Sequence, residues 1–261
     1  MALFGLAFGS FLNVCISRLP RHESIVRPAS RCPRCGSAIR AADNIPLLSW
    51  LLLRGRCRNC GGKIAWRYPT VELAMACLFL LSWLRLGLTL EGIGADVLCF
   101  LLLGLAVMDA ETMRLPDAFT LPGIVLGIVF AGVKPAASGW AHLLHAGEAA
   151  GWAAVAAAIL LAIRGIYFLV RRREGMGLGD AKLLALIAAW LGPELGGMAL
   201  FLGVVSAAIY GVVRGLVAQA GFRSRKLRNA RLPLGAFLSA AAIYVTFEGE
   251  KILNWYMNFF R

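Results

Sequence analysis

Charged residues are scarce in this chain: Asp, Glu, Lys and Arg make up only 16% of its 261 residues, whereas 59% are hydrophobic. Soluble domains are usually about a quarter charged and about half apolar. The composition therefore excludes an ordinary soluble protein and predicts a polytopic membrane protein. The first apolar run also lacks the basic segment that opens a cleavable signal peptide, so no such peptide is expected.

Acidic residues are rarer than basic ones. The chain has 14 Asp and Glu against 27 Lys and Arg, which gives a net charge of +13. On a soluble fold such an excess would suggest a nucleic-acid partner. Here the basic residues cluster in a few loops between apolar runs. This pattern predicts contacts with anionic membrane lipids and no nucleic-acid partner.

Apolar runs close to the roughly 20-residue length of a membrane span recur along the chain. They cover residues 1–18, 69–86, 92–110, 117–134, 147–170, 180–192, 194–218 and 232–249. The sixth run is short, and Gly192-Pro193 separates it from the seventh. We therefore predict an all-α membrane protein with about eight transmembrane helices.

The loop charges predict how these helices are oriented. If the loop with the paired cysteines is inside, the inner segments 18–68, 111–116, 171–179 and 219–231 hold 20 Lys and Arg, and the outer segments hold 4. Basic loops favour the cytoplasmic side of a membrane. We predict an amino terminus outside and three parts: a first transmembrane helix (1–18), a cytoplasmic insert (19–68) and the remaining helices (69–261).

The insert contains a strong metal-binding motif. Cys32 with Cys35 and Cys57 with Cys60 form two Cys-x-x-Cys pairs, separated by 21 residues and each followed by glycine. Two such pairs can surround one zinc ion tetrahedrally. Disulfides are the alternative, but a cytoplasmic loop is kept reduced. We predict a structural zinc site, which implies a folded subdomain and no chemistry of its own.

Three aspartates lie where apolar runs meet predicted cytoplasmic turns. Asp109 ends the third run, Asp117 begins the fourth, and Asp180 begins the sixth after Gly177 and Gly179. An aspartate can cap a helix by accepting its first amide hydrogens, which would explain Asp117 and Asp180. Asp109 is harder to explain structurally, because a negative charge is unfavourable at the carboxyl end of a helix.

A catalytic pair of aspartates is the alternative interpretation. Two carboxylates that share a site cannot both ionise easily, so one can act as a base toward water while its protonated partner polarises a peptide carbonyl. The glycines before Asp180 would let a backbone or an extended substrate approach closely. Spacing alone leaves open whether Asp180 is a cap or a catalytic acid.

Several motifs of one family occur in order between residue 9 and about residue 192: GSFLNVCISRLP, the paired cysteines, RYPTVELA, MDAETMRLPD and GLGDAK. Together they resemble the type IV prepilin peptidases, which are GxGD intramembrane aspartyl proteases. The resemblance implies a bacterial inner-membrane enzyme that cuts the basic leader from prepilin or pseudopilin precursors on the cytoplasmic side. It implies methylation of the new amino terminus with S-adenosylmethionine. It also implies that Asp109 and Asp180 are catalytic, with Asp117 and Lys182 in supporting positions.

The resemblance places the methyltransferase near the insert, with Glu72 as the matching acid. Its alternative role is to stabilise the amino terminus of its helix. No glycine-rich nucleotide loop of the Rossmann type follows a strand, so the cofactor site must be of another kind. Family members often have glycine where this chain has Ala76, which keeps a GxGD protease without methyltransferase activity as an alternative. Ser10 and Asn13 are expected to hydrogen-bond between helices.

A non-enzymatic transporter or scaffold is the alternative from a different class. In such a protein Asp109 would be a helix-end acid and Asp180 a cap. A transporter would also be expected to carry functional acids near the middle of the bilayer. The apolar runs show no acid at that depth, so the sequence favours an enzyme.

Overall fold

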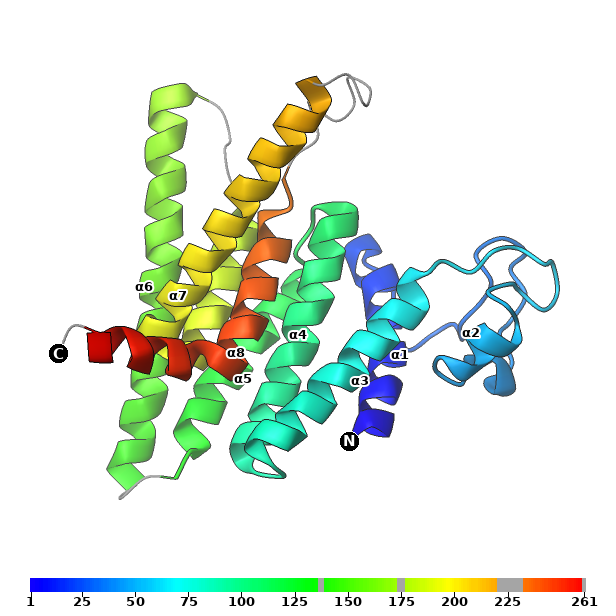
Figure 1. Cartoon of the computed structure of the whole chain (residues 1–261), viewed down its shortest axis with the longest axis horizontal. Helices are drawn as coiled ribbons and strands as arrows, with labels where there is room; N and C mark the ends of the chain where they lie inside the picture. The colour runs from blue at the N-terminus through cyan, green and yellow to red at the C-terminus, as the bar shows by residue number, and fades with distance from the viewer. Residues whose placement is uncertain (136–138, 173–176, 220–231, 260–261) are drawn as a thin grey trace. The chain divides into compact units, whose positions relative to one another are not determined.

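The computed structural model describes residues 1–135, 139–172, 177–219 and 232–259 (Figure 1). Most of the predicted inner loop 219–231 and part of the loop 171–179 therefore lie outside the described residues. Within the described ranges there is no strand, only two isolated β-bridges, which join Arg31 to Ala38 and Arg56 to Lys63. The predicted all-α class is confirmed for this part of the chain.

The described residues form eight α-helices and two short 3-10 helices. They are α1 (Ala2–Arg18), η1 (Leu19–Arg21), η2 (Ala41–Asn44), α2 (Leu48–Leu52), α3 (Arg67–Leu86), α4 (Leu90–Thr112), α5 (Asp117–Val133), α6 (Gly139–Arg171), α7 (Leu178–Gln219) and α8 (Leu234–Phe259). The chain divides into two compact units, Met1–Gly104 and Leu105–Arg261. Helix α4 contributes residues to both units.

Small residues bring α1 and α3 together in the first unit. A methyl group added at Gly5 would lie 2.6 Å from Cα of Ala76, and one added at Gly9 would lie 2.7 Å from Cα of Glu72. Glycines four residues apart allow helix backbones to approach this closely inside a membrane. Phe8 adds an apolar contact, since its ring centroid lies 5.5 Å from that of Phe79.

Helix α7 is the centre of the second unit, because it packs against α5, α6 and α8. Leu183, Leu186 and Ile187 in its first half are completely buried. A methyl group at Gly203 would lie only 2.9 Å from Cα of Leu238 in α8, so these helices also meet backbone to backbone. The buried first half of α7 gives Asp180, at its start, a rigid support.

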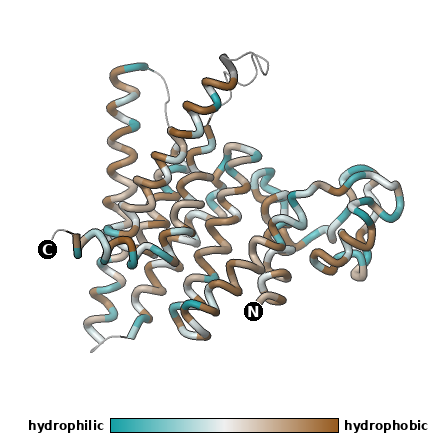
Figure 2. The backbone as a smooth tube through the Cα atoms, viewed as in Figure 1, coloured by the Kyte–Doolittle hydropathy of each residue, from teal (hydrophilic) through white to brown (hydrophobic). Residues whose placement is uncertain are grey.

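Five helices of the described residues are long and apolar enough to cross a membrane, namely α1, α3, α4, α6 and α7, and α5 is a shorter apolar helix (Figure 2). Exposed apolar side chains such as Phe201 and Val212 on α7 fit a lipid environment. Helix α7 is interrupted at Gly192, where φ is 73°, followed by Pro193. This break is where the sequence separates its sixth and seventh runs. The count of eight spans, the orientation and the boundaries of the three parts stay predictions.

Candidate active site

Asp109 lies in the last turn of α4 and contacts the beginning of α8. Its side chain is buried, with 6% of its surface exposed, and its Oδ2 accepts a hydrogen bond of 3.0 Å from the backbone N–H of Ala236. The first amides of a helix lack partners within that helix. The carboxylate, unfavourable at the end of its own helix, is therefore favourably placed at the amino terminus of another.

Asp180 is the third residue of α7, which begins at Leu178. Its Oδ2 accepts a hydrogen bond of 3.3 Å from the backbone N–H of Gly177, the residue before the helix. A side chain at this position that bonds back to the preceding amide forms one half of a capping box. The alternative in which Asp180 is the N-cap residue itself does not match the structure, because the helix starts two residues earlier and Asp180 lies in its first turn.

The structure places Asp109 and Asp180 on turns that pack against one another in the second unit. Leu115, in the turn after α4, packs against Gly179, next to Asp180, and against Gly235, next to Asp109. A methyl group at Gly179 would lie 3.0 Å from Cβ of Leu115, and one at Gly235 would lie 3.1 Å from its Cδ1. The turns that carry both aspartates therefore meet at the start of α8, within one compact unit.

Asp117 and Lys182 form an ion pair beside this site. The distance from Nζ of Lys182 to Oδ1 of Asp117 is 2.5 Å, and the side chains are 34% and 61% exposed, respectively. Asp117 is the first residue of α5, and no side-chain cap is formed there. The predicted capping role of Asp117 is therefore wrong, and the residue instead ties the start of α5 to the start of α7.

Ala236 and Gly235 were not identified from the sequence, although they touch Asp109. The only local signal was Leu-Pro-Leu-Gly ahead of an apolar run. Proline before a helix and glycine in its first turn indicate a helix start where another group approaches the backbone. Such a signal cannot say which acid, 127 residues away, is the partner.

The four cysteines of the insert converge on one point. Their Sγ atoms all lie within 4.8 Å of one another, and those of Cys32 and Cys60 are 3.9 Å apart. Thiolates around a tetrahedral zinc ion are about 3.8 Å apart, given Zn–S bonds of about 2.3 Å. The predicted cluster could therefore hold one metal ion, whereas two disulfides would not require all four thiols to meet.

The two cysteine pairs have the same local structure. The N–H groups of Gly36 and Gly61 donate to the carbonyls of Cys32 and Cys57, each over 2.9 Å. Both glycines have positive φ, 71° and 65°, which favours glycine over other residues. Hydrogen bonding with Ser37 lowers the pKa of the Cys35 thiol to about 6, whereas burial and the other three cysteines raise the pKa of the Cys60 thiol to about 11.

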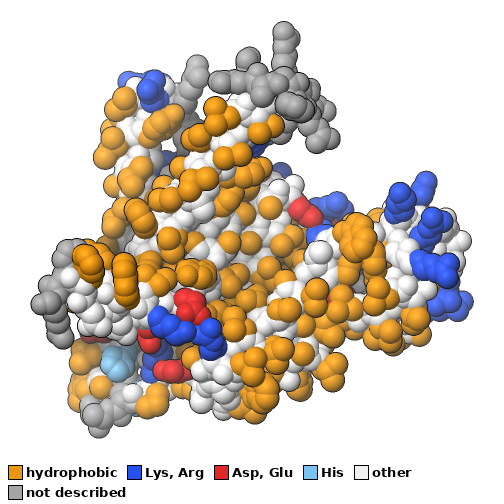
Figure 3. Space-filling model, viewed as in Figure 1, with side chains coloured by type: hydrophobic (Ala, Val, Ile, Leu, Met, Phe, Trp, Pro, Cys, Tyr) orange, Lys and Arg blue, Asp and Glu red, His pale blue; other side chains and the backbone are white. Residues whose placement is uncertain are grey.

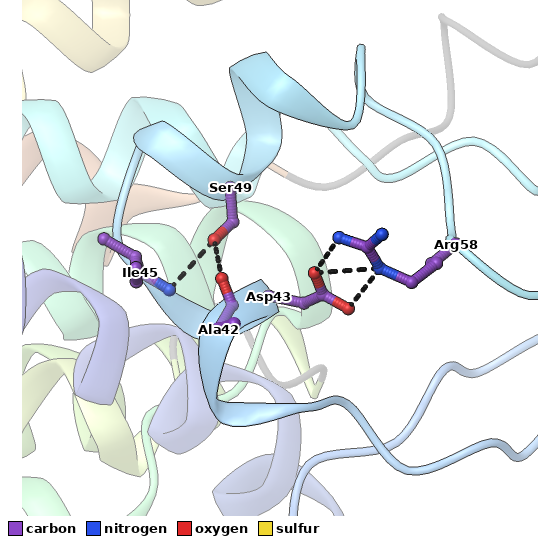
Figure 4. A network of polar contacts seen from close by, with 5 residues as sticks. All are labelled: Ala42, Asp43, Ile45, Ser49 and Arg58. Atoms are coloured by element: carbon purple, nitrogen blue, oxygen red, sulfur yellow. Dashed lines mark hydrogen bonds and ion pairs between the residues drawn. The ribbon is translucent and has the colours of Figure 1, made fainter.

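The segment between the two cysteine pairs is held in place by polar contacts (Figure 4). Arg58 donates to both carboxylate oxygens of Asp43 over 2.6–3.1 Å, and this pairing lowers the pKa of Asp43. Ser49 accepts from the N–H of Ile45 and donates to the carbonyl of Ala42. Lys and Arg side chains gather on the outer surface of the insert (Figure 3).

Glu72 joins this insert to the helices of the first unit. Its side chain is 7% exposed, and its Oε2 accepts a hydrogen bond of 2.8 Å from the N–H of Leu47, just before α2. Ser10 in α1 also hydrogen-bonds to it. Glu72 is the sixth residue of α3, outside the first turn, so the alternative in which it stabilises the amino terminus of that helix does not match the structure. Asn13 donates to the carbonyl of Tyr68 over 3.0 Å, which confirms the predicted hydrogen bonding between helices.

Known proteins match the chain over both units. A family model described as the bacterial peptidase A24 N-terminal domain matches residues 3–86, and one described as the type IV leader peptidase family matches residues 96–212. The chain is 34% identical to the prepilin leader peptidase/N-methyltransferase of Aeromonas salmonicida (strain A449), over 98% of this chain and 92% of that protein. The chain belongs to the type IV leader peptidase family.

Other relatives agree with this membership. The prepilin leader peptidase/N-methyltransferase of Bacillus subtilis (strain 168) is 34% identical over 98% of this chain and 96% of its own length. That of Myxococcus xanthus (strain DK1622) is 43% identical over 72% of this chain and 54% of its own length. No solved structure matches. In this member of the type IV leader peptidase family, the cysteines and Glu72 lie in the first match and the three border aspartates in the second. Membership of a peptidase family excludes the transporter and scaffold alternative.

Proposed function

We propose that this chain is a prepilin leader peptidase and N-methyltransferase whose catalytic residues are Asp109 and Asp180. The observation that supports the proposal is that the turns carrying these two carboxylates pack together through Leu115 beside the start of α8, within one compact unit. Each carboxylate also has one oxygen held by a backbone amide. Gly177 next to Asp180 has no side chain that would obstruct an extended peptide, whereas the absence of a side chain at Gly179 lets Leu115 pack closely.

Hydrolysis needs one ionised and one protonated carboxyl group. The ionised aspartate takes a proton from a water molecule, whose oxygen attacks the carbonyl carbon of the glycine that ends the leader. The protonated aspartate donates its proton to the carbonyl oxygen and so stabilises the tetrahedral intermediate. When the intermediate collapses, the C–N bond breaks, the first aspartate gives the proton taken from water to the leaving nitrogen, and the second aspartate regains its proton from a hydroxyl of the intermediate. The products are a leader with a carboxylate and a mature chain with a free amine.

The substrates follow from the site and the relatives. We infer that the enzyme lies in the inner membrane of a bacterium, with its amino terminus outside and its catalytic side facing the cytoplasm, as the loop charges favour. The substrates are precursors of type IV pilins or pseudopilins, whose short basic leader is followed by an apolar helix. Recognition by packing of this apolar helix agrees with the exposed apolar side chains of the enzyme's own helices.

We assign a structural zinc ion to Cys32, Cys35, Cys57 and Cys60. The donor set fits, because four thiolates at this separation complete a tetrahedron and leave no position open for a reacting water molecule. Zinc would hold the two cysteine pairs together, and the contacts of Asp43 and Ser49 would order the segment between them. The insert then presents the N–H of Leu47 to Glu72.

The methyl donor that we propose is S-adenosylmethionine, and Glu72 is the residue that we assign to it. A buried carboxylate can attract the positively charged sulfonium and ammonium groups of this cofactor. Leu47 and Ser10 hold the carboxylate at the junction of the insert, α3 and α1. The bound donor would supply the methyl group for the new amino terminus, while these residues bind and orient it.

The test compares the wild type with Asp109→Asn and Asp180→Asn in liposomes. The substrate is a precursor with a basic leader that ends in glycine-phenylalanine, and mass spectrometry follows cleavage and methylation with and without S-adenosylmethionine. Asparagine keeps the size of aspartate but cannot titrate. We expect each variant to lose cleavage by about 10²–10⁴-fold. Cleavage by both variants would disprove the assignment, and an unmethylated wild-type product would favour the protease alone.

A further inference from the structure

The amino terminus of α8 touches the catalytic carboxylate that we assign to Asp109. Its Oδ2 lies 3.0 Å from the N of Ala236, the third residue of α8. A methyl group added at Gly235 would lie 3.0 Å from the same oxygen and 3.1 Å from Cγ of Asp109. The carboxylate is therefore both hydrogen-bonded to the first turn of α8 and packed against its backbone.

This contact differs from an ordinary helix cap. A cap side chain normally comes from the residue just before the helix. Pro233 precedes α8 and has no side-chain acceptor, so Asp109 takes over this function from a position 127 residues earlier. The N–H of Ala236 also lies 3.2 Å from the carbonyl of Pro233, a longer contact within the same turn. The shorter bond goes to the carboxylate.

Both aspartates accept a hydrogen bond from a backbone amide, but the two amides belong to different parts of the chain. Oδ2 of Asp180 accepts from Gly177, three residues away on its own turn. Oδ2 of Asp109 accepts from α8, which must be packed in place before the bond can form. An amide hydrogen bond disfavours a proton on the oxygen that accepts it. Both bonds engage Oδ2, so we expect Oδ1 of each residue to exchange protons with water and substrate.

We propose that the amino terminus of α8, through the amide of Ala236 and the bare backbone of Gly235, is a positioning element of the peptidase site. It fixes Oδ2 of Asp109 and so directs Oδ1 toward the reacting water. The proposal rests on the proposed function of Asp109 and Asp180. Gly235 has no side chain and Ala236 has only a methyl group, so neither offers a reacting group, and both act through Asp109.

The amide can be removed without removing the helix. Ala236→Pro deletes the N–H, and proline is tolerated in the first turn of a helix, where amides lack helical partners. Gly235 lacks the Cβ that would clash with a following proline. The matched variant Ala236→Gly keeps the N–H but is less favourable in a helix than alanine. The pair therefore separates the hydrogen bond from helix stability.

The measurement is steady-state cleavage of the basic-leader precursor by the full chain in liposomes. We expect Ala236→Pro to lower kcat about 10- to 100-fold with KM nearly unchanged, because a hydrogen bond to a charged group is lost. Ala236→Gly should retain most of the wild-type kcat. Wild-type kcat in Ala236→Pro would overturn the proposal. An equal loss in Ala236→Gly would overturn it too, because it would assign the effect to the helix.

A second pair of variants tests the close packing and does not depend on proline. Gly235→Ala places a methyl group against the carboxylate and should lower kcat, while the thermal unfolding temperature stays close to that of the wild type. Gly197→Ala in α7 is the matched control, because no atom lies within 4 Å of its added methyl group. Equal kcat in both would overturn the proposal. Asp109→Asn and Asp180→Asn are measured alongside. If these two variants still cleave the precursor, the proposed function has failed. If they lose cleavage while Ala236→Pro and Gly235→Ala keep it, only the role of α8 is rejected.

Discussion

The cysteine cluster and the aspartate site differ in how far along the chain their partners lie. Each cysteine pair closes its own turn, as when Cys32 donates its N–H to the carbonyl of Ser37. In the aspartate site, Lys182 reaches Asp117 from 65 residues away and Ala236 reaches Asp109 from 127 residues away. The turns of the cysteine cluster are thus formed by residues close in sequence, whereas the aspartate site forms only when distant helices have packed.

This difference predicts what each region needs in order to form. The insert has few buried apolar residues, so four neighbouring thiols depend on a metal ion to stay together. The aspartate site is supported by the fully buried Leu183, Leu186 and Ile187 of α7, which need no ligand. The two regions should therefore fail independently, and the metal-removal experiment tests that independence.

Metal removal should have the largest effect. Treatment with a strong zinc chelator, or Cys57→Ser, should unfold the insert, because small metal sites are often unfolded without their ion. Methylation of a precleaved peptide should then fall by at least about 10-fold, since metal-site disruption costs on that order, while precursor cleavage persists. Metal analysis, trypsin sensitivity of residues 19–68 and mass spectrometry measure the three outcomes.

Cys77→Ser is the matched control for this experiment. Cys77 is exposed on α3 and lies outside the four-cysteine cluster. Its replacement should change neither metal content nor methylation. If cleavage fell together with methylation after chelation, the two regions would not be independent, and the insert would have to support the aspartate site as well.

Glu72→Gln should have an intermediate effect and separates two roles of this residue. Glutamine keeps an oxygen that can accept the N–H of Leu47, so the insert should stay docked and keep its metal. The lost charge should weaken binding of the cationic methyl donor about 10-fold, the loss expected when a charge-assisted hydrogen bond is removed. The observable is the KM for S-adenosylmethionine on a precleaved peptide. An unchanged KM would restrict Glu72 to a structural role.

The same difference in sequence separation explains what could be predicted. The cysteine site was found from spacing alone, because Cys-x-x-Cys with a following glycine dictates its own turn. Hydropathy likewise located the break at Gly192 in α7. The cysteine turns and the break at Gly192 depend on residues that are neighbours in the sequence, so they can be predicted from a short stretch of it.

The partners of the aspartates could not be predicted in this way. Hydropathy and loop charge predict that Asp109, Asp117 and Asp180 lie at one membrane border, and the motifs indicate which two are catalytic. The bond from Ala236 to Asp109 and the pair of Asp117 with Lys182 depend on how α4, α5, α7 and α8 pack. The start of α7 lies two residues before Asp180, a difference within the uncertainty of one or two residues with which helix starts are assigned.

The ion pair of Lys182 and Asp117 should have the smallest effect. Both side chains are partly exposed, at 34% and 61%, so water screens the pair and its contribution to stability should be at most about 1 kcal/mol. A double-mutant cycle of Lys182→Gln and Asp117→Asn, read by thermal unfolding, measures this coupling. Cleavage should fall by only a few-fold in either single variant, because the buried core of α7 still positions Asp180. A loss as large as that of Asp180→Asn would instead give one of these residues a direct part in the reaction, and a coupling near zero would show that packing alone sets the start of α7.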